Sequence, residues 1–565
     1  MEEKVHYRPL KPAEVAQLER QGNRAGDWSG VQVCDDTDLG VICHNRFGNG
    51  VAIGRVAAIT DSRLEDCSVG DGSTVDSVHL LRGYDIGAGC RIDGVGRMTF
   101  GGAKLEVMNE NGNRAIAVVP GMTVGDAYLW ARYRGRKELM RRFEQWSATN
   151  RRGSVGDGTV IENAIAVVDG VIGPDCRIEH GVIAVRFLLG EHVHLEYGLR
   201  LNDAVVGDNS TLARCEVGNS LIFPAHEQHH NNSFLIAGLV MGQSNIAAGS
   251  TIGSNHNSRT ADNELAAGRG FWPGLCCSFK HSSRFASYCL LAKADYPAEL
   301  DIKLPFALVS NNVSKDRLEV MPAYWWMYNM YALDRNSRKF AHRDKRTVKA
   351  QHIEFDPLAP DTAEEIFRGM ELLRNWMANA KDGVVYGEGM EKSKRPTVIL
   401  KAKEGLQAYE DMLVYYAMKT LLQTELAEGI RGDNIRARAY SESPVCACDQ
   451  WVNIGGQLVA QSGVEQLIAD VEQGVIAGWS DLHARMDALW EQYPAQREAH
   501  AYSVLCRLAG VATLDEALWQ QYCQRYGEIL QYIEVQKKAS REKDDTNPFR
   551  RMTYWDDAER EAVIS

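Results

Sequence analysis

Aliphatic residues recur at a fixed interval along this chain, and a glycine follows each one. Seven-residue units with an aliphatic residue at both ends are spaced 17 residues apart in two series, beginning at Val69 and Ile86 and at Val155, Ile172, Leu189 and Val206. Two later units, beginning at Met241 and Ile246, continue the hexapeptide pattern, with aliphatic residues at Met241, Ile246 and Ile252. Regular spacing of this kind is typical of a β-solenoid built from hexapeptide repeats.

The composition of each unit suits a solenoid with three-sided coils. A short strand directs one aliphatic side chain toward the axis, while Gly, Asp or Asn at the corner tolerates a left-handed backbone. One coil cannot bury its own apolar row, so coils stack with about 4.8 Å between strands. The sequence therefore predicts a mainly β fold, a parallel solenoid with a helical insert and an α-helical C-terminal region.

Breaks in the repeat divide the chain into four parts. We expect an irregular lead-in over residues 1–50 and the solenoid over 51–345, interrupted by an insert at about 99–153. An α-helical domain over 346–536 and a charged arm over 537–565 follow. Capping patterns predict helices that begin near Thr123, Asp361, Ser462 and Thr513.

Charge and composition narrow the class of protein. The formal net charge of −12 argues against general nucleic-acid binding, for which a basic surface is expected. The N-terminus has no apolar signal region and no apolar run reaches 18 residues, so we expect a cytoplasmic protein without membrane contact. The 13 cysteines fit reduced thiols in that compartment.

Candidate chemistry is concentrated between residues 226 and 281, which hold five of the 15 histidines. His256 and His281 share the pattern His-x-Ser-Arg, which brings Arg259 and Arg284 with them. We expect the two patterns to occupy equivalent positions on adjacent coils. The other candidate ligand-binding residues are Asn255, Asn257, Lys280, Arg269, His230 and Asn231.

These residue types suit acyl transfer to an anionic acceptor. A neutral histidine is a natural general base near pH 7, and arginine offers a planar fork for phosphate or carboxylate. Three alternatives stay open: hydrogen-bonded polar ladders inside the solenoid, a zinc site built from histidines of adjacent coils, and a non-enzymatic scaffold. No set of metal ligands is assigned.

Several motifs resemble known proteins. The repeats are similar to those of the left-handed β-helix, or hexapeptide-repeat, superfamily. Longer segments resemble a functionally uncharacterised bacterial family of that superfamily, namely the stretches at 253–259, 268–274, 280–287, 294–300 and 321–333. The superfamily implies a homotrimer with sites between neighbouring subunits, a histidine that activates the acceptor, and an acyl donor lying along the solenoid. No familiar acyltransferase signature surrounds His256 or His281.

The leading hypothesis is thus a cytoplasmic acyltransferase-like enzyme that acts on a sugar phosphate, nucleotide sugar or similar anionic acceptor, with an acyl-CoA as a possible donor. His281 is the first candidate for the base and His256 the second, while Arg259 and Arg284 would hold the anionic group. A metal-dependent lyase or hydrolase is the alternative enzyme.

Overall fold

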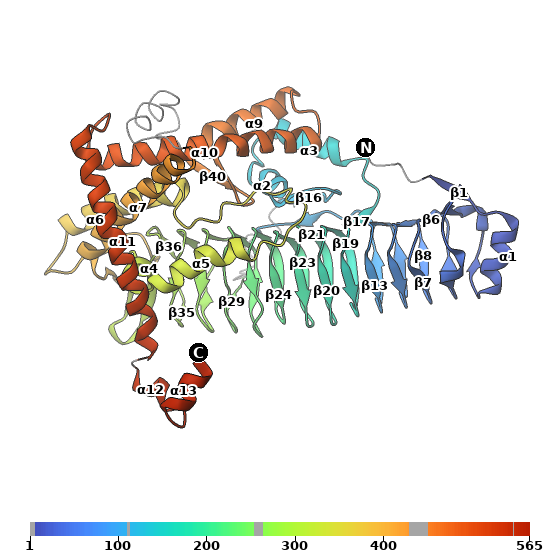
Figure 1. The fold of residues 1–565 in the computed structure, drawn as a ribbon, viewed down its shortest axis with the longest axis horizontal. Coiled ribbons are helices and arrows are strands. Elements are labelled where there is room, and N and C mark those ends of the chain that lie inside the picture. Colours follow the sequence, from blue (N-terminus) through green and yellow to red (C-terminus); the bar gives the residue numbers. More distant parts are fainter. Residues whose placement is uncertain (1–5, 110–112, 254–263, 429–449, 546, 565) are drawn as a thin grey trace.

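The computed structural model describes residues 6–109, 113–253, 264–428, 450–545 and 547–564. Its body is a long β-solenoid, and the helical region covers the half that lies toward the C-terminal end of the coils (Figure 1). The predicted solenoid and its helical additions are therefore confirmed. No helix in the described parts of the chain is both long and apolar enough to cross a membrane.

The coils form three parallel ladders of short strands. The first contains β2 (Arg24–Ala25), β5 (Arg46–Phe47), β8 (Arg63–Glu65), β11 (Leu81–Arg82), β14 (Arg97–Thr99), β27 (Phe234–Ile236), β29 (Thr251–Ile252), β32 (Ser278–Phe279) and β35 (Asp295–Tyr296). The second contains β3 (Val31–Cys34), β6 (Val51–Ile53), β9 (Cys67–Val69), β12 (Tyr84–Ile86), β17 (Gly153–Val155), β28 (Gly238–Val240), β30 (Leu265–Ala267), β33 (Arg284–Phe285) and β36 (Asp301–Ile302).

The third ladder contains β4 (Ile42–Cys43), β7 (Ala58–Thr60), β10 (Thr74–Asp76), β13 (Arg91–Asp93), β18 (Val160–Glu162), β20 (Arg177–Glu179), β22 (His194–Glu196), β24 (Thr211–Ala213) and β26 (Glu227–Gln228). A shorter sheet extends the C-terminal end through β31 (Trp272–Pro273), β34 (Leu290–Leu291), β37 (Leu308–Asn312), β38 (Arg317–Met321) and β39 (Thr397–Ile399).

Four seven-residue strands join the first ladder to the second in the middle of the solenoid: β19 (Ala166–Ile172), β21 (Ile183–Leu189), β23 (Arg200–Val206) and β25 (Glu216–Ile222). Each turns the corner at a residue with positive φ, at Asp169, Arg186, Asp203 and Asn219. The 17-residue step becomes the strand register, because Ile161 pairs with Ile178 and Ile178 with Leu195. All three side chains are fully buried in the axis.

The solenoid begins earlier than the sequence analysis placed it. β3 pairs in parallel with β6, and β2 pairs with β5, so coils already form within the expected lead-in of residues 1–50. These coils lack the Gly-Asp corner motif, which is why the repeat pattern did not reveal them. β1 (Tyr7–Pro9) and α1 (Pro12–Arg20) cover this end, with Leu18 buried.

The insert between β14 and β17 is helical in its later half, as predicted. It holds the hairpin of β15 (Leu105–Glu106) and β16 (Ala115–Ile116), then α2 (Val124–Arg132) and α3 (Lys137–Ser147). Thr123 and Asp126 form the expected capping box at the start of α2. Arg136 then binds Glu465 and Glu472 at 3.1 and 2.6 Å, which ties the insert to α9 (Gln461–Gln473).

The remaining helices are α4 (Tyr324–Tyr328), α5 (Met330–His342), α6 (Pro360–Ala378), α7 (Ala402–Glu428), α10 (Trp479–Ala509), α11 (Glu516–Asp545), α12 (Pro548–Arg551) and α13 (Asp557–Ile564). The hairpin of β40 (Trp451–Ile454) and β41 (Gln457–Ala460) precedes α9. α6 begins at Pro360 after an Ala359 cap, so Asp361 lies in its first turn and is not its cap. α11 extends to Asp545, so it includes the first residues of the charged segment that was expected over 537–565.

Candidate functional site

An open cavity of about 470 Å³ lies between α6 and the second ladder of the solenoid. We call it the α6 cleft. Its floor is formed by residues of β30, β33 and β36 and the positions just after them, and its roof by Glu365, Arg368 and Leu372 of α6. Those three positions are spaced i, i+3 and i+7, so one face of the helix lines the cavity.

Small residues on the outer face of the strands keep the cleft open. Alternation along a strand sends Phe285 and Ile302 into the solenoid axis, where both are buried. The outward positions between the charged residues of the floor are held by Ala266, Gly268 and Ala286. With so little side-chain volume there, α6 cannot pack flush against the sheet.

Charged side chains line both walls. Arg284 and Lys303 rise from the strands and Arg368 from α6, while Asp301 and Glu365 supply the carboxylates. Asp301 accepts two hydrogen bonds from Arg284, at 2.8 and 3.0 Å, and lies 3.5 Å from Lys303. The Arg284 side chain still keeps 68% of its surface exposed. Three cations against two carboxylates make the cleft attractive to an anion.

Glu365 is the unusual member of this group. Burial is the largest cause that raises its pKa, to about 7; the charge of Asp361 adds to the shift and that of Arg368 opposes it. Its Oε2 accepts a hydrogen bond from the backbone N–H of Ser287 at 2.9 Å. A carboxyl with a pKa near 7 populates both protonation states at neutral pH, which is what a general acid or base requires.

A glycine allows this contact. At Gly268 a Cβ atom would lie 2.7 Å from the backbone nitrogen of Ser287, closer than real Cβ atoms approach. The absence of a side chain therefore lets the two coils bring the Ser287 N–H up to Glu365.

Arg284 is the sequence-predicted residue that the structure places in the cleft. His281 lies at the turn between β32 and β33, with 6% of its surface exposed, and does not belong to the lining. Lys280 beside it is bound to Glu299 at 3.1 Å. The sequence analysis predicted that His256 and Arg259 lie on the coil next to His281 and Arg284. His256 and Arg259 lie outside the described residues, as do the candidates Asn255 and Asn257.

Two other candidates occupy a different edge of the solenoid. His230 and Asn231 are exposed in the turn that follows β26, with the rings of His229 and His230 4.7 Å apart. Nearby, His226 is fully buried: its Nδ1 lies 2.8 Å from Ser244 Oγ and its Nε2 lies 3.1 Å from Gln228 Oε1. This arrangement is a hydrogen-bonded polar ladder inside the coils, one of the alternatives left open above.

Arg269 is buried in the seam between the solenoid and the helical region. Its guanidinium donates to both carboxylate oxygens of Asp361, at 2.9 and 2.8 Å, and to the carbonyl oxygen of Asp356 at 3.0 Å. Arg497 continues the network by binding Glu354 at 3.0 Å and the Asp356 carboxylate at 2.8 Å. Protein acceptors thus surround Arg269, and its role as a ligand-binding residue stays a prediction.

Sequence reasoning missed Glu365, Arg368, Asp301 and Lys303. The repeat step holds a signal for Asp301, because it follows Arg284 by 17 residues and must stack beside it. Nothing local marks α6 as the roof of a cleft. Among the described residues, no three His, Cys, Asp or Glu side chains gather as a metal site.

Comparison with known proteins adds a family relationship. Residues 7–180 match the family model described as a domain of unknown function (DUF4954). A protein of Treponema pallidum (strain Nichols), named "Uncharacterized protein", is 39% identical in an alignment that covers 99% of this chain and 90% of that protein. The similarity therefore extends through the solenoid, the insert and the helical region alike.

Proposed function

The chain belongs to the family that includes the Treponema pallidum protein, and from its α6 cleft we propose that it is an enzyme that binds a small anionic substrate and transfers a proton through Glu365. The observation that carries this proposal is the Glu365 carboxyl, held by the Ser287 N–H in a cavity lined by three cationic side chains. Burial raises the pKa of this carboxyl to about 7, which agrees with a role in proton transfer. The volume, about 470 Å³, is within the range of small-molecule sites.

We assign the roles by position. Arg284, Lys303 and Arg368 bind the anionic group of the substrate, with Arg368 closing from the helix side. Glu365 in its ionised form accepts the proton of an acceptor hydroxyl, and the Ser287 N–H keeps its carboxylate oriented. This assignment moves the base from His281 to Glu365, since His281 does not line the cleft.

Acyl transfer remains the reaction class that we propose. The acceptor hydroxyl attacks the carbonyl of a thioester donor such as acetyl-CoA, its proton passes to Glu365, and the departing thiolate takes that proton as the new ester forms. We further propose that the solenoid belongs to the hexapeptide-repeat superfamily and acts as a cytoplasmic homotrimer. A sugar phosphate or nucleotide sugar is the proposed acceptor.

Ligand binding tests the cleft directly. Binding of glucose 6-phosphate, UDP-N-acetylglucosamine and acetyl-CoA would be measured calorimetrically with wild type, Arg368→Ala and Arg374→Ala. Arg374 is the matched control, because it lies on the same helix but is bound to Glu410 at 3.3 Å outside the cleft. Arg368→Ala should weaken binding of at least one ligand by about 10-fold or more, the size expected for a lost charge-assisted hydrogen bond, and Arg374→Ala should leave it unchanged. An equal effect of both substitutions, or no binding of any ligand, would refute the proposal.

A further inference from the structure

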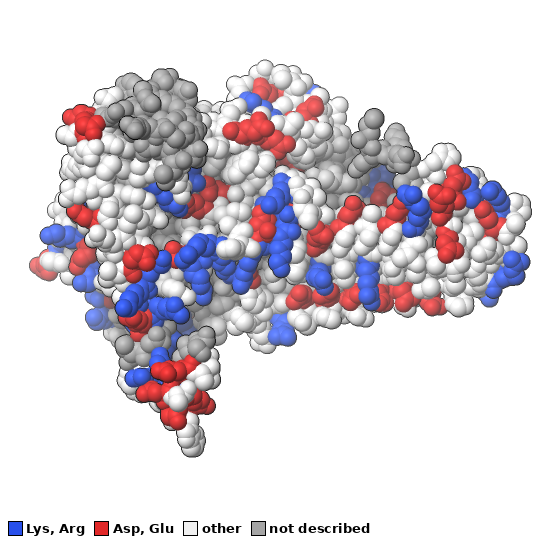
Figure 2. Space-filling view, viewed as in Figure 1, with Lys and Arg blue, Asp and Glu red and all other residues white. Residues whose placement is uncertain are grey.

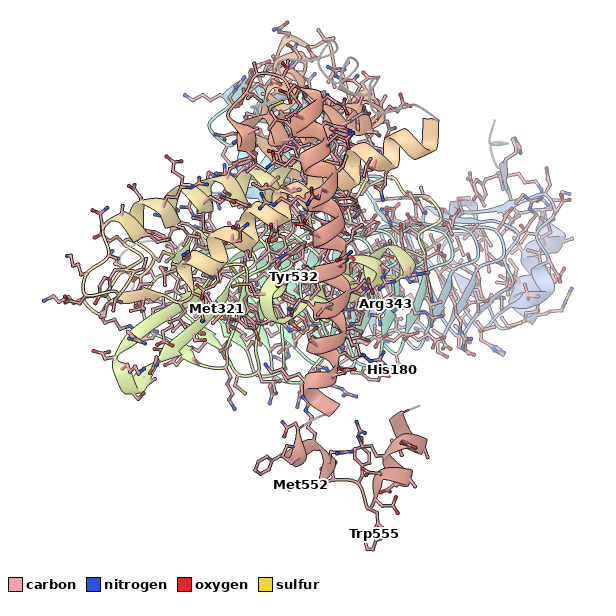
Figure 3. All side chains as sticks on the ribbon, turned by 60° about the vertical axis from the view of Figure 1, so that its left-hand side comes forward. His180, Met321, Arg343, Tyr532, Met552 and Trp555 are labelled. Atoms are coloured by element: carbon pink, nitrogen blue, oxygen red, sulfur yellow. The ribbon has the colours of Figure 1, made fainter. Side chains whose placement is uncertain are left out.

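The C-terminal residues 547–564 form an arm that projects from the body. α11 crosses the end of the helical region and carries α12 and α13 beyond it (Figures 1 and 3). Of the side chains described in this arm, over 547–563, none is buried. The arm is therefore a helical element whose surface almost all faces solvent.

Large apolar side chains are concentrated on the arm. The exposed fractions are 76% for Phe549, 73% for Met552, 94% for Trp555 and 67% for Val563. Figure 3 shows Met552 and Trp555 well away from the rest of the chain. Single exposed apolar residues are ordinary, but four within one short element mark an interaction surface. Burying a side chain of this size stabilises a complex by roughly 1.5–3 kcal/mol before the costs of association.

The arm is also acidic around α13. Four carboxylates outnumber three arginines over residues 547–564; the carboxylates belong to Asp556, Asp557, Glu559 and Glu561, and the arginines are Arg550, Arg551 and Arg560. Arg551 binds Asp557 at 3.0 Å, so the excess negative charge comes from the other carboxylates of α13 and its first turn. Figure 2 shows these carboxylates gathered on the projecting element. A partner surface should therefore be basic with some exposed apolar area.

One surface of this same chain has those properties. We call it the α5 stripe, formed by the exposed cations of α5 and the segment after it: Arg335, Arg338, Arg343, Lys345 and Lys349. Figure 2 shows Lys and Arg side chains gathered over α5, although the whole protein carries a net charge of −12. Three of these cations already form ion pairs within the chain: Arg338 with Asp334, Arg343 with Glu227 at 3.2 Å and Lys349 with Asp344 at 3.7 Å. Arg335 and Lys345 form no ion pair with any described residue, so they are the cations left for a partner. An exposed apolar side chain lies within the stripe, since Val348 is 64% exposed between Lys345 and Lys349.

The arm does not occupy the α5 stripe of its own chain. α11 contacts the first turns of α5, where the N–H of Tyr331 donates to Ser540 Oγ at 3.0 Å and Lys537 lies 3.5 Å from Asp334. Beyond that contact the chain runs away from α5, and Arg343 is far from Trp555 in Figure 3. The complementary surfaces of one chain are thus oriented to meet only between two copies.

We propose that the arm docks in trans on the α5 stripe of a second copy of this chain. Its carboxylates face the cations of the stripe, and Trp555 and Met552 cover the exposed apolar area beside them. Aromatic residues bury roughly 150–250 Å² each, so one docked arm and the surface it covers together bury on the order of 1,000 Å² from apolar residues alone, and each subunit of the proposed homotrimer can donate one arm and receive another. That area approaches the roughly 1,200–2,000 Å² of a stable interface once the polar contacts are added.

Sedimentation velocity of the full chain tests the proposal through a charge swap. The arm variant is Asp557→Lys/Glu561→Lys and the stripe variant is Arg335→Glu/Lys345→Glu. Each alone should associate at least 10-fold more weakly than wild type, whereas an equimolar mixture of the two should regain association. Trp555→Ala should also weaken association by 10-fold or more. The control Lys381→Glu/Lys394→Glu changes two exposed lysines elsewhere and should associate as wild type does.

Three results would overturn the proposal. They are a wild-type chain that stays monomeric at tens of micromolar, variants that associate as strongly as wild type, and a mixture that fails to regain what each variant lost. If the arm captures another protein while the wild-type chain stays monomeric, the proposal is likewise overturned. The outcome is independent of the α6 cleft, because no residue changed here lines it.

Discussion

The N–H of Ser287 donates a 2.9 Å hydrogen bond to Glu365, and this contact joins the end of a solenoid strand to the helix above it. It also fixes the carboxyl in an environment where burial raises the pKa to about 7. The position of Glu365 thus explains both its hydrogen bond to the solenoid and its raised pKa.

Glu365 should make the fold less stable at alkaline pH. Its pKa rises from 4.5 to about 7 on folding, so between these values the unfolded chain is ionised while the folded chain keeps the proton. Stability therefore falls as pH rises through this window. Glu365→Gln should unfold like wild type at pH 4.5 and be more stable at pH 8, by up to about 3 kcal/mol. Urea titrations at the two pH values check this, with the exposed Glu371→Gln as control; an equal difference at both pH values would contradict it.

Gly268→Ala should disturb the Ser287–Glu365 contact. The new Cβ meets the Ser287 nitrogen at 2.7 Å, so the two coils must separate, at a cost of about 1–3 kcal/mol. The control is Gly527→Ala in α11, where a Cβ has nothing within 4 Å and helix propensity favours alanine by about 1 kcal/mol. Thermal unfolding should therefore shift down for the first variant and up or not at all for the second. A Gly268→Ala protein as stable as wild type would show that the close approach is unimportant.

Arg269 and Asp361 should behave as a buried ion pair. Only 2% of the Arg269 side chain and 14% of that of Asp361 are exposed. Arg269→Met should cost about 3–5 kcal/mol because it strands a buried carboxylate, and adding Asp361→Leu should recover much of that loss. Arg284→Met, which breaks a pair with 68% of the arginine exposed, should cost less than about 1 kcal/mol. Similar losses for the two single variants in urea unfolding would argue against this assignment.

His226 should destabilise the fold in acid. Burial lowers its pKa from 6.5 to about 4, so the unfolded chain binds a proton between these values that the folded chain does not. Stability is lost as pH falls through this window, by about 2 kcal/mol at pH 5. The drop between pH 7 and pH 5 should therefore be smaller by that amount in His226→Gln, while the exposed His230→Gln should keep the whole drop. An unchanged drop in His226→Gln would remove this residue from the account.

The repeat pattern predicted the solenoid because its physical cause is local. Each coil needs an inward aliphatic residue and a corner residue that accepts positive φ, and the aliphatic residue recurs every 17 residues from Val155 to Val206. The same step places Asp301 beside Arg284. The first coils escaped notice because residues around Arg24–Phe47 bury apolar side chains without the glycine motif.

The site was harder to predict because its parts are joined only by tertiary packing. Arg284 was identified because it belongs to the His-x-Ser-Arg pattern. The sequence around Glu365 holds no repeat that would show that α6 packs over β33. Arg269 shows the opposite difficulty. The sequence analysis named it as a candidate ligand-binding residue, and only the folded chain reveals Asp361 as its partner.

Proton uptake on anion binding tests the central claim most directly. An anion in the α6 cleft should raise the pKa of Glu365 above its value of about 7, because a second negative charge disfavours the ionised carboxyl. Sulfate, which does not titrate near neutral pH, would be titrated calorimetrically into the protein at pH 7.5 in two buffers of different ionisation enthalpy. The account predicts uptake of a fraction of a proton per sulfate bound, lost in Glu365→Gln and kept in Glu371→Gln. Binding without proton uptake, the same uptake in Glu365→Gln, or no sulfate binding would contradict it.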